Sequence, residues 1–323
     1  MQIESLRIGT RGSDLALWQA NWVKQRLEAL HPGIAVAITI IKTTGDRVLD
    51  APLSKIGDKG LFTREIENAL LRGEIDLAVH SLKDLPTELP SGLQIGAITE
   101  REDPRDVFLP HPSNACRSLL DQPTGVTVAT GSLRRKCQLK ALRPDVHVVD
   151  VRGNLSTRLR KLDDSDWAGM LLARAGVIRL GWEARIGEIV PADLILPAVG
   201  QGALAIEIKE GDERALTAVA PLANTQTTSA VLAERSLLRR LEGGCQVPIG
   251  TYARIDTEKG IERLVMDAMV GSLDGARVVR GHAEGTASEA ESLGRSLAET
   301  LLRDGADTIL ATIRGSTFNE HGA

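Results

Sequence analysis

The fold is decided by residues 126–162, which read VTVATGSLRRKCQLKALRPDVHVVDVRGNLSTRLRKL. This stretch holds two copies of one pattern, in which a β-rich apolar run is followed by a turn and a helix. The runs are Val126–Thr130 and Val146–Val151, and the helices are Leu133–Leu142 and Leu155–Leu162. Strands that alternate with helices of this length are typical of an α/β domain. We therefore expect such a domain in the middle of the chain.

The same pattern extends on both sides of this stretch. Upstream, a first α/β domain is predicted from the strand Leu6–Thr10, the helix Leu15–Leu30, the strand Ala35–Ile41, the helix Thr63–Leu71 and the strands Ile75–Val79 and Leu93–Ile98. Downstream, Gly169–Ala173 adds a strand, and the apolar run Ala203–Ile208 is expected to return to the first sheet. The charged run Arg101–Asp106 is predicted to be a solvated crossing between the two domains.

From about Pro221 the pattern changes. A helix at Ser229–Leu241, strands within residues 251–281, a helix at Ala287–Arg303 and a strand at Thr308–Ile313 predict a small α+β domain. The predicted division of the chain is residues 1–99 with 200–220, residues 100–199, and residues 221–323. Within the first of these, the glycine-punctuated charged loop 45–60 is either a disordered excursion or a functional lid.

Composition and charge exclude several classes of function. The 323-residue chain is 42% apolar and 25% charged, which is ordinary for a soluble globular protein. Its eight aromatic residues (Trp 4, Tyr 1, Phe 3) are too few for the stacking platforms of single-strand nucleic-acid binders. No apolar stretch approaches the length of a membrane span, and the N-terminal residues do not form an export signal. We therefore expect a cytoplasmic protein with no membrane or nucleic-acid partner.

The three cysteines are Cys116, Cys137 and Cys245, and no Cys-x-x-Cys or His-Glu-x-x-His spacing occurs, so we predict neither a disulfide framework nor a metal site. Cys245 lies in Leu241–Gly250, LEGGCQVPIG, where two glycines precede it and Pro248 prevents a helix from continuing. A cysteine chosen blind is more often a small apolar core residue. A thiol on irregular backbone is presented rather than packed, so we expect a nucleophilic or tethering role for Cys245.

Positive charge is concentrated in one region. The net charge is −4, yet residues 131–180 hold eleven Lys/Arg against five Asp/Glu, a local charge of +6. Arg134 and Arg135 lie in the first turn of a predicted helix, where cations are unfavourable unless an anion docks there. Further arginines follow the next strands at Arg152, Arg158 and Arg179. Because arginine's planar fork suits carboxylates, we expect a localised anionic ligand, with solvated surface charge as the alternative.

A carboxylate is predicted at the rim of the first domain. The strand Ile75–Val79 leads into HSLKDLP, which places Asp84 at the carboxyl end of a strand, where open α/β sheets bind ligands. There it could stabilise a cation or shuttle a proton. An ordinary turn residue before Pro86 is the alternative. Arg11, two residues before the predicted helix N-cap Ser13, stands where an anion could dock as well, although for Arg11 alone an ordinary surface charge is the more common case.

These residues together resemble one family. The sequence is similar to the porphobilinogen deaminases, also called hydroxymethylbilane synthases, over nearly its whole length. The motifs that carry the resemblance are Thr10-Arg11 with Leu15–Ala20 (LALWQA), Lys59–Phe62 (KGLF), His80–Asp84 (HSLKD), Gly131–Arg135 (GSLRR), Arg152–Asn154 (RGN) with Thr157–Leu159 (TRL), Ala198–Gly202 (AVGQG) and Glu242–Gln246 (EGGCQ). Most of these motifs are weak singly, but the combination is highly specific.

The resemblance implies a fold and an activity. The fold has two α/β domains like those of type II periplasmic binding proteins, joined by paired crossovers, and a small α+β third domain. The activity is that of a transferase in tetrapyrrole and heme biosynthesis, which condenses four porphobilinogens head to tail into hydroxymethylbilane and releases ammonia. A dipyrromethane cofactor, attached through a thioether to Cys245, primes the chain. The enzyme is expected to be a cytoplasmic monomer that hands its product to uroporphyrinogen-III synthase.

The resemblance also implies roles for single residues. Asp84 matches the catalytic carboxylate, which stabilises the cation formed when the amine leaves. The implied cofactor-binding residues are Ser81, Lys83, Asp84, Thr130, Ser132, Arg134, Arg135 and Gln201. The implied substrate-binding residues are Arg11, Ser13, Gln19, Arg152, Arg158 and Arg179, and the implied lid residues are Lys55 and Lys59. No metal is implied.

Two other classes of protein would share parts of this pattern. A periplasmic anion-binding protein would explain the arginines, but it would carry an export signal and has no use for a presented cysteine. A transcriptional regulator with this ligand-binding fold would need an N-terminal helix-turn-helix module, whereas strand-forming residues start at Leu6. A colour reaction for pyrroles on the purified protein would separate the three classes.

Overall fold

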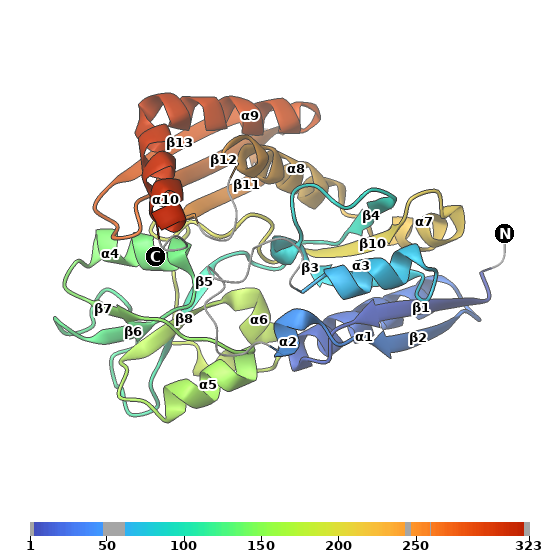
Figure 1. The fold of residues 1–323 in the computed structure, drawn as a ribbon, viewed down its shortest axis with the longest axis horizontal. Coiled ribbons are helices and arrows are strands. Elements are labelled where there is room, and N and C mark those ends of the chain that lie inside the picture. Colours follow the sequence, from blue (N-terminus) through green and yellow to red (C-terminus); the bar gives the residue numbers. More distant parts are fainter. Residues whose placement is uncertain (1–2, 48–61, 243–246, 259, 320–323) are drawn as a thin grey trace. The chain divides into compact units, whose positions relative to one another are not determined.

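A computed structural model describes residues 3–47, 62–242, 247–258 and 260–319 (Figure 1). The chain divides into two compact units, Met1–Glu102 with Gly200–Thr228 and Asp103–Val199 with Ser229–Ala323. It therefore enters the second unit near residue 103 and returns to the first near residue 200. The finer division into three domains stays a prediction.

The first unit is built on one five-stranded sheet. Its strands are β1 (Ser5–Thr10), β2 (Ala35–Ile40), β3 (Leu77–Ser81), β4 (Leu93–Ile98) and β10 (Leu204–Lys209). Its helices are α1 (Asp14–Leu30), α2 (Thr44–Arg47), α3 (Arg64–Leu71) and α7 (Glu213–Val219), with 3-10 turns η2 (Leu82–Asp84) and η4 (Ala220–Leu222). The strand order is β2-β1-β3-β10-β4. β1 runs parallel to β2 and β3, whereas β10 runs antiparallel to β3 and β4, so the predicted return of residues 203–208 to this sheet is confirmed.

Local sequence accounts for the start of this sheet. The hydroxyl of Ser13 accepts a hydrogen bond from the backbone N–H of Ala16 at 3.4 Å, so Ser13 caps α1 as predicted. One face of α1, with Val23 and Leu27, packs on the buried side chain of Ile8 in β1. The helix and sheet faces therefore enclose an apolar core, as an α/β layer requires.

The second unit contains a five-stranded sheet of related design. Its strands are β5 (Asp106–Pro110), β6 (Thr127–Ala129), β7 (His147–Val149), β8 (Gly169–Ala173) and β9 (Glu188–Ile189). Its helical segments are α4 (Leu133–Leu142), α5 (Leu155–Asp163), α6 (Arg174–Arg179) and the 3-10 turn η3 (Glu183–Arg185). In the order β7-β6-β8-β5-β9, β6 is parallel to β7 and β8, and β5 is antiparallel to β8 and β9. Each sheet thus has an antiparallel strand beside one edge.

The strand β5 corrects one expectation. The prediction of a solvated crossing at Arg101–Asp106 is wrong for its last residue, because Asp106 is fully buried at the start of β5. Val107, Phe108 and Leu109 continue the strand and are fully buried as well. The burial of Asp106 is possible because two arginines from α4 neutralise its charge, as described below.

The rest of the second unit is a small α+β layer. Its elements are α8 (Thr225–Arg240), β11 (Ile249–Glu258), β12 (Ile261–Gly271), β13 (Val278–Gly285), the 3-10 turn η5 (Ala287–Glu289), α9 (Ala290–Leu301), the π-helical turn η6 (Leu302–Ala306) and α10 (Asp307–Asn319). The strands form an antiparallel meander in the order β11-β12-β13. Helices cover one face of this sheet (Figure 1). Leu237, Leu264 and Leu297 belong to the buried apolar cluster between them. The predicted α/β class is confirmed, with two five-stranded mixed sheets and a small α+β region.

The predicted strand at Thr308–Ile313 is wrong, because this segment belongs to the helix α10. Its buried side chains are Ile309, Leu310 and Ile313, which recur at helical rather than alternating spacing. Before it, Gly305 adopts φ 108°, where a residue with a side chain is strained, and this bend directs the chain into α10. Packing of one apolar stripe on the sheet therefore overrides the β-rich local composition.

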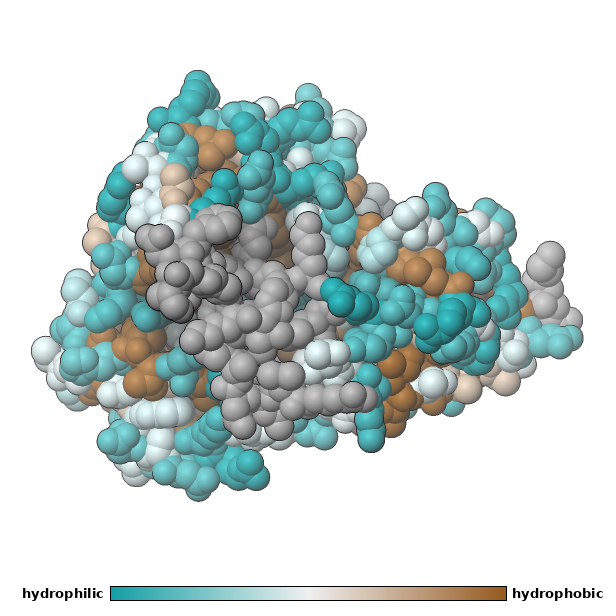
Figure 2. Space-filling model, in the orientation of Figure 1, coloured by the Kyte–Doolittle hydropathy of each residue, from teal (hydrophilic) through white to brown (hydrophobic). Residues whose placement is uncertain are grey.

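The face of the molecule shown in Figure 2 is mainly hydrophilic. On this face, polar and charged side chains form most of the surface of the described residues, and hydrophobic side chains gather in separate small patches. No helix in the described ranges is long and apolar enough to cross a membrane.

Candidate active site

Asp84 lies on an exposed turn at the carboxyl end of β3. The strand ends two residues later than predicted, at Ser81, and Leu82–Asp84 form η2. The buried side chains of Leu82 and Leu85 anchor this turn, and the N–H of Leu85 donates to the carbonyl of Leu82 at 3.1 Å. Within the described ranges no hydrogen bond or ion pair engages the carboxylate of Asp84. The turn therefore presents a carboxylate that is available to a ligand.

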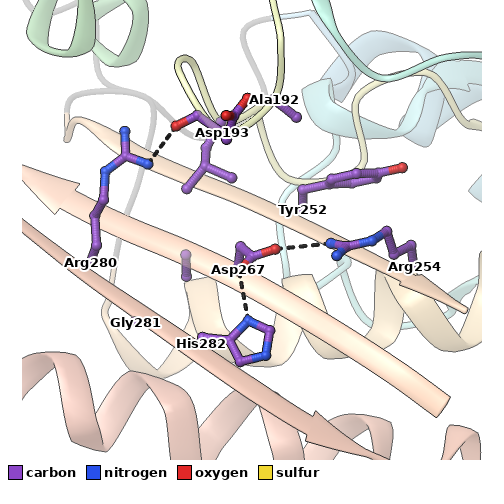
Figure 3. Close-up of a pocket in the computed structure, with 10 residues that line it drawn as sticks. Ala192, Asp193, Tyr252, Arg254, Asp267, Arg280, Gly281 and His282 are labelled. Carbon is purple, nitrogen blue, oxygen red and sulfur yellow. Dashed lines mark hydrogen bonds and ion pairs between the residues drawn. The ribbon is translucent and has the colours of Figure 1, made fainter. Parts of the chain in front are cut away.

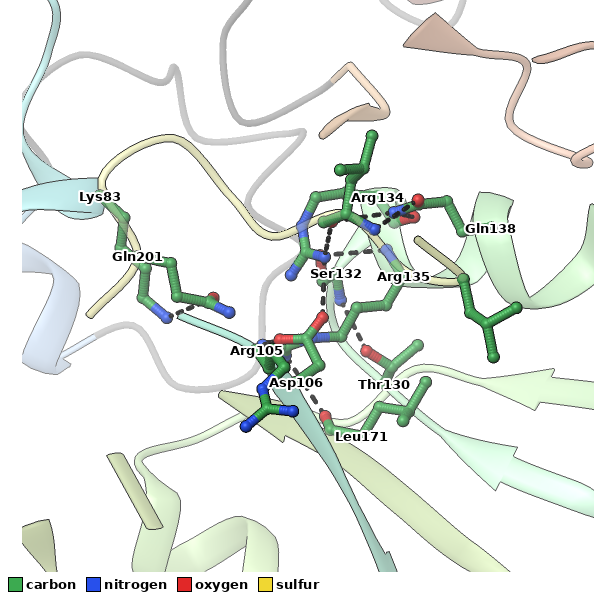
Figure 4. A network of polar contacts seen from close by, with 12 residues as sticks. Lys83, Arg105, Asp106, Thr130, Ser132, Arg134, Arg135, Gln138, Leu171 and Gln201 are labelled. Atoms are coloured by element: carbon green, nitrogen blue, oxygen red, sulfur yellow. Dashed lines mark hydrogen bonds and ion pairs between the residues drawn. The ribbon is translucent and has the colours of Figure 1, made fainter. Parts of the chain in front are cut away.

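Four of the predicted site residues meet in two pairs around this turn. The amide of Gln19 on α1 donates to the hydroxyl of Ser81 at 2.8 Å. The ammonium of Lys83 donates to the side-chain oxygen of Gln201 at 3.4 Å (Figure 4). Gln19 and Gln201 are almost fully buried, so both amides are held in place. The structure brings these residues together, and their roles stay predictions.

The backbone that presents Gln201 depends on glycine. Gly200 and Gly202 on either side have φ values of 67° and 96°, which favour glycine. A Cβ at Gly202 would also clash with the carbonyl oxygen of Glu102. The guanidinium of Arg101 donates to the backbone carbonyl of Gln201 at 2.8 Å and completes this arrangement.

Two predicted substrate residues follow β1. The guanidinium carbon of Arg11 lies 4.3 Å from the centroid of the Phe62 ring, in a cation–π contact that restricts its position. Ser13 uses its hydroxyl oxygen to cap α1, so a cap role is shown and a substrate role stays a prediction. Lys55, Lys59 and Cys245 lie outside the described residues, as does most of the loop 45–60.

The second unit holds a buried cluster of two arginines on one carboxylate (Figure 4). Nη1 of Arg134 lies 2.8 Å from Oδ2 of Asp106, and Nη2 of Arg135 lies 2.8 Å from Oδ1. Arg134 also donates to the carbonyl of Leu196, and Arg135 to that of Leu171 at 3.3 Å. The side chains are 5%, 6% and 0% exposed for Arg134, Arg135 and Asp106. We call these three residues the Asp106 cluster.

The Asp106 cluster keeps its charges despite burial. Burial alone would raise the pKa of Asp106, but the two guanidiniums hold that pKa well below its usual range. Burial lowers the pKa of Arg134, and Asp106 opposes this effect. Two cations and one anion leave a net charge of +1. In addition, Nε of Arg134 is buried with no acceptor in the described part of the chain. This donor set suits a carboxylate ligand.

The turn before α4 supplies two further predicted residues. Ser132 caps α4, since its hydroxyl accepts from the backbone N–H of Arg135 at 3.4 Å. The hydroxyl of the buried Thr130 accepts from the backbone N–H of Ser132 at 3.3 Å. The two hydroxyls are thereby fixed next to the first turn of α4, which carries both arginines.

The other predicted arginines are less deeply placed. Nε of Arg152 lies 2.7 Å from Oδ2 of Asp150, and Nε of Arg158 donates to the carbonyl of Gly153 at 2.8 Å. Arg179 ends the short helix α6, which follows β8, and is half-buried. Arg152 and Arg158 follow β7 and Arg179 follows β8 in the same sheet, which is consistent with a predicted carboxylate-binding rim.

Sequence reasoning missed two buried polar groups. Asp106 was hidden in a charged run, and the only signal was the apolar stretch that follows it directly. The second group is His80, whose Nε2 lies 3.1 Å from Oε2 of the fully buried Glu207 in β10. This pair joins β3 to β10 directly before the Asp84 turn, so it contributes to the position of that turn.

A separate hollow of about 520 Å³ lies on the outer face of the β11–β13 sheet (Figure 3). Asp267 accepts from Nδ1 of His282 at 2.7 Å and from Nη1 of Arg254 at 2.9 Å. Arg280 donates to the backbone carbonyl of Asp193 at 2.8 Å. These polar groups satisfy one another, and no predicted site residue lines this hollow. We call Asp267, Arg254 and His282 the Asp267 cluster. In the described ranges no group of three or more His, Cys, Asp or Glu could hold a metal ion.

Comparison with known proteins gives a consistent result over both units. Residues 6–217 match the family model "Porphobilinogen deaminase, dipyromethane cofactor binding domain", and residues 228–303 match "Porphobilinogen deaminase, C-terminal domain". The chain is 49% identical over 313 residues to the porphobilinogen deaminase of Syntrophotalea carbinolica, covering 97% of each chain. It is 50% identical over 307 residues to that of Carboxydothermus hydrogenoformans, covering 95% of this chain and 96% of the relative.

Solved structures show a more distant likeness. The probable amino-acid ABC transporter extracellular-binding protein ytmK from Bacillus subtilis has a TM-score of 0.39 and 9% sequence identity. The match covers 68% of this chain and 91% of that protein.

Proposed function

Because the chain belongs to the porphobilinogen deaminase family, we propose that Asp84 is its catalytic carboxylate and that Cys245 carries its dipyrromethane cofactor through a thioether. The enzyme joins four porphobilinogen molecules head to tail into hydroxymethylbilane and releases ammonia at each step. This is a transferase reaction of tetrapyrrole and heme biosynthesis. When bound, the dipyrromethane supplies the terminal pyrrole to which the first porphobilinogen is joined.

The Asp106 cluster is the observation that supports a binding site for the dipyrromethane cofactor. A dipyrromethane built from two substrate units has carboxylates on both rings, so its site needs fixed cationic donors. Arg134 and Arg135 are held rigidly, keep a net positive charge with Asp106, and include a buried N–H of Arg134 with no acceptor in the described ranges. We assign the cofactor carboxylates to these two arginines. The other assigned cofactor-binding residues are Ser81, Lys83, Thr130, Ser132 and Gln201.

Asp84 acts on the incoming porphobilinogen. The aminomethyl group of porphobilinogen is an ammonium group at neutral pH. When its C–N bond breaks, ammonia leaves with the electron pair and the methylene carbon becomes cationic. The positive charge spreads to the pyrrole nitrogen, where the exposed carboxylate of Asp84 stabilises it. The methylene carbon then bonds to the free α-carbon of the neighbouring pyrrole, which loses its proton. The exposure of Asp84 on a rigid turn suits this role, because no described residue competes for its charge.

The substrate's own carboxylates are assigned to the remaining arginines. These are Arg11, Arg152, Arg158 and Arg179, with Ser13 and Gln19 as polar partners. Lys55 and Lys59 are assigned to a lid that covers the reacting groups. We further propose that the enzyme works as a cytoplasmic monomer and passes its product to uroporphyrinogen-III synthase, since a linear tetrapyrrole needs a ring-closing enzyme to act next.

Intact mass measures the proposed attachment directly. Protein purified from cells that make porphobilinogen should be heavier than its sequence by two linked pyrrole units, and the excess should map to the peptide that contains Cys245. Limited substrate should then add mass in steps of one deaminated unit, because the product grows while attached. A mass equal to the bare polypeptide would overturn the proposal.

Three cysteine variants separate the attachment site from other thiols. Cys245→Ser should lack both the excess and the ladder, because a hydroxyl is a far weaker nucleophile than a thiolate. Cys137→Ala and Cys116→Ala should keep both. Burial raises the pKa of the Cys137 thiol to about 11, so this thiol stays protonated and unreactive. A mass excess that persists in Cys245→Ser would place the cofactor elsewhere.

A further inference from the structure

Asp106 differs from the residues assigned so far, because its carboxylate binds arginines of the protein rather than a ligand. It is fully buried at the start of β5, and its two oxygens accept from different arginines at 2.8 Å each. Both oxygens of this carboxylate are thus engaged by guanidiniums of the protein. Its chemistry is therefore directed at Arg134 and Arg135.

The contacts of the two arginines fix each guanidinium at more than one point. Arg134 is held by Asp106 and by the carbonyl of Leu196, and Arg135 by Asp106 and by the carbonyl of Leu171. A guanidinium bound at two places cannot rotate freely, so the direction of its other N–H groups is set in advance. Arg134 keeps at least its buried Nε–H for another acceptor.

The charge of Asp106 also matters. Without it, two buried guanidiniums would lie side by side with a charge of +2 and would repel each other. With it, the cluster carries +1, and the two guanidiniums hold the pKa of Asp106 below its usual range although burial would raise it.

We propose that Asp106 is a positioning residue, which orients Arg134 and Arg135 so that their remaining N–H groups bind the carboxylates of the cofactor. This inference rests on the proposed function of the two arginines. It differs from a purely structural role, in which Asp106 would stabilise the fold and the cofactor would bind equally well in any folded variant.

The test compares the rate of cofactor incorporation among folded variants, one of which loses stability without any change of charge. Full-length protein is produced in cells that cannot make porphobilinogen, and the rate at which it gains the two-pyrrole mass excess on addition of porphobilinogen is followed. Asp106→Asn keeps the shape of the side chain but points an N–H group at one of the arginines. We expect incorporation at least about tenfold slower than in the wild type, because a charge-assisted hydrogen bond is lost and one guanidinium is misdirected.

Two controls separate positioning from loss of stability. Leu109→Ala lies in the same strand and lowers stability through a cavity without touching a charge. It should incorporate the cofactor at a near wild-type rate. The variant Asp145→Asn, which removes a half-buried partner of Arg143, should do the same. Wild-type incorporation in Asp106→Asn, or equal slowing in Leu109→Ala, would overturn the proposal.

A second variant covers the case in which Asp106→Asn does not fold. Asp106→Glu keeps the buried charge but shifts the carboxylate by one methylene, so it should fold and still incorporate the cofactor more slowly than Leu109→Ala. A folded Asp106→Glu protein with the wild-type rate would contradict positioning. If the wild type itself gains no mass, the proposed function fails. If the wild type gains the mass excess and the folded Asp106 variants gain it at the same rate, this inference fails while the proposed function stands.

Discussion

Asp84 and Asp106 are aspartates with opposite surroundings. Asp84 is exposed on a turn and has no hydrogen bond or ion pair within the described ranges, whereas Asp106 is fully buried between two arginines. A carboxylate whose two oxygens are engaged by arginines acts through those arginines. A carboxylate that is held in place and exposed can meet a charge that appears during a reaction. The same side chain thus positions other groups in one place and is suited to catalysis in the other.

The Asp267 cluster separates the two variables, burial and pairing. Asp267 has two cationic partners, as Asp106 has, but its side chain is 36% exposed and those of Arg254 and His282 are 33% and 51% exposed. If ion pairing alone determined how much an aspartate contributes to the free energy of unfolding, removal of Asp106 and removal of Asp267 would cause equal losses. If burial determines it, Asp267 should matter little. The following predictions decide between these possibilities.

The largest effect is expected on the rate of Asp84→Asn. The amide cannot carry the negative charge that offsets a developing cation, so turnover of porphobilinogen should fall by roughly 10²–10⁴ while the unfolding transition stays unchanged. Steady-state consumption of porphobilinogen and a denaturant titration measure both quantities. Glu88→Gln, an exposed acid in the following loop, is the matched control and should keep its activity. A loss smaller than about threefold would make Asp84 an ordinary turn residue.

The largest effect on stability is expected for Asp106→Ala. Removal of the carboxylate leaves two buried guanidiniums without their shared partner, which should lower the free energy of unfolding by about 3–5 kcal/mol. Urea titration followed by circular dichroism measures this loss. A change below about 1 kcal/mol, typical of an exposed pair, would show that the cluster is not desolvated as the structure indicates.

A much smaller effect is expected for Asp267→Ala. Exposed ion pairs contribute roughly 0–1 kcal/mol, because water and salt screen them, so the same titration should show a loss within that range. The loss should shrink further at high salt, unlike that of Asp106→Ala. Equal losses in the two variants would mean that pairing rather than burial sets the weight of these aspartates.

The smallest expected effect is a pH dependence at His282. Its hydrogen bonds to Asp267 and Glu284 raise the pKa of His282 above its ordinary value. A raised folded-state pKa means that the imidazolium contributes stability fully below the unfolded pKa of about 6.5, and that this contribution is lost as the pH rises through the folded pKa. NMR titration of the imidazole should give a raised pKa in the wild type and a value closer to the ordinary one in Asp267→Ala. An unshifted wild-type titration would contradict the contact.

The sequence predicted the elements whose reasons are local. The strand–helix alternation, the N-cap at Ser13 and the return of residues 203–208 to the first sheet are all confirmed. Each depends on a periodicity or on a capping residue within a few positions. The presence of Asp84 at the end of a strand was predictable for the same reason.

The sequence did not predict features whose reasons are distant. The burial of Asp106 depends on Arg134 and Arg135, which follow it by 28 and 29 positions, and a charged residue without a visible partner reads as solvated. The segment Thr308–Ile313 has β-rich composition, and only its packing on the sheet favours the helix. Contacts between predicted site residues, such as that of Lys83 with Gln201, likewise depend on the folded chain.

The position of β10 in its sheet has a consequence for how this protein is made. β10 lies between β3 and β4 in the sheet of the first unit. It is formed by Leu204–Lys209, which follow all five strands (β5 to β9) of the five-stranded sheet of the second unit. During synthesis, β3 and β4 therefore lack their shared neighbour β10 until more than 200 residues have left the ribosome. The nascent first unit exposes the hydrogen-bonding groups of β3 and β4 in this interval, which makes it a substrate for chaperones and a site of premature aggregation.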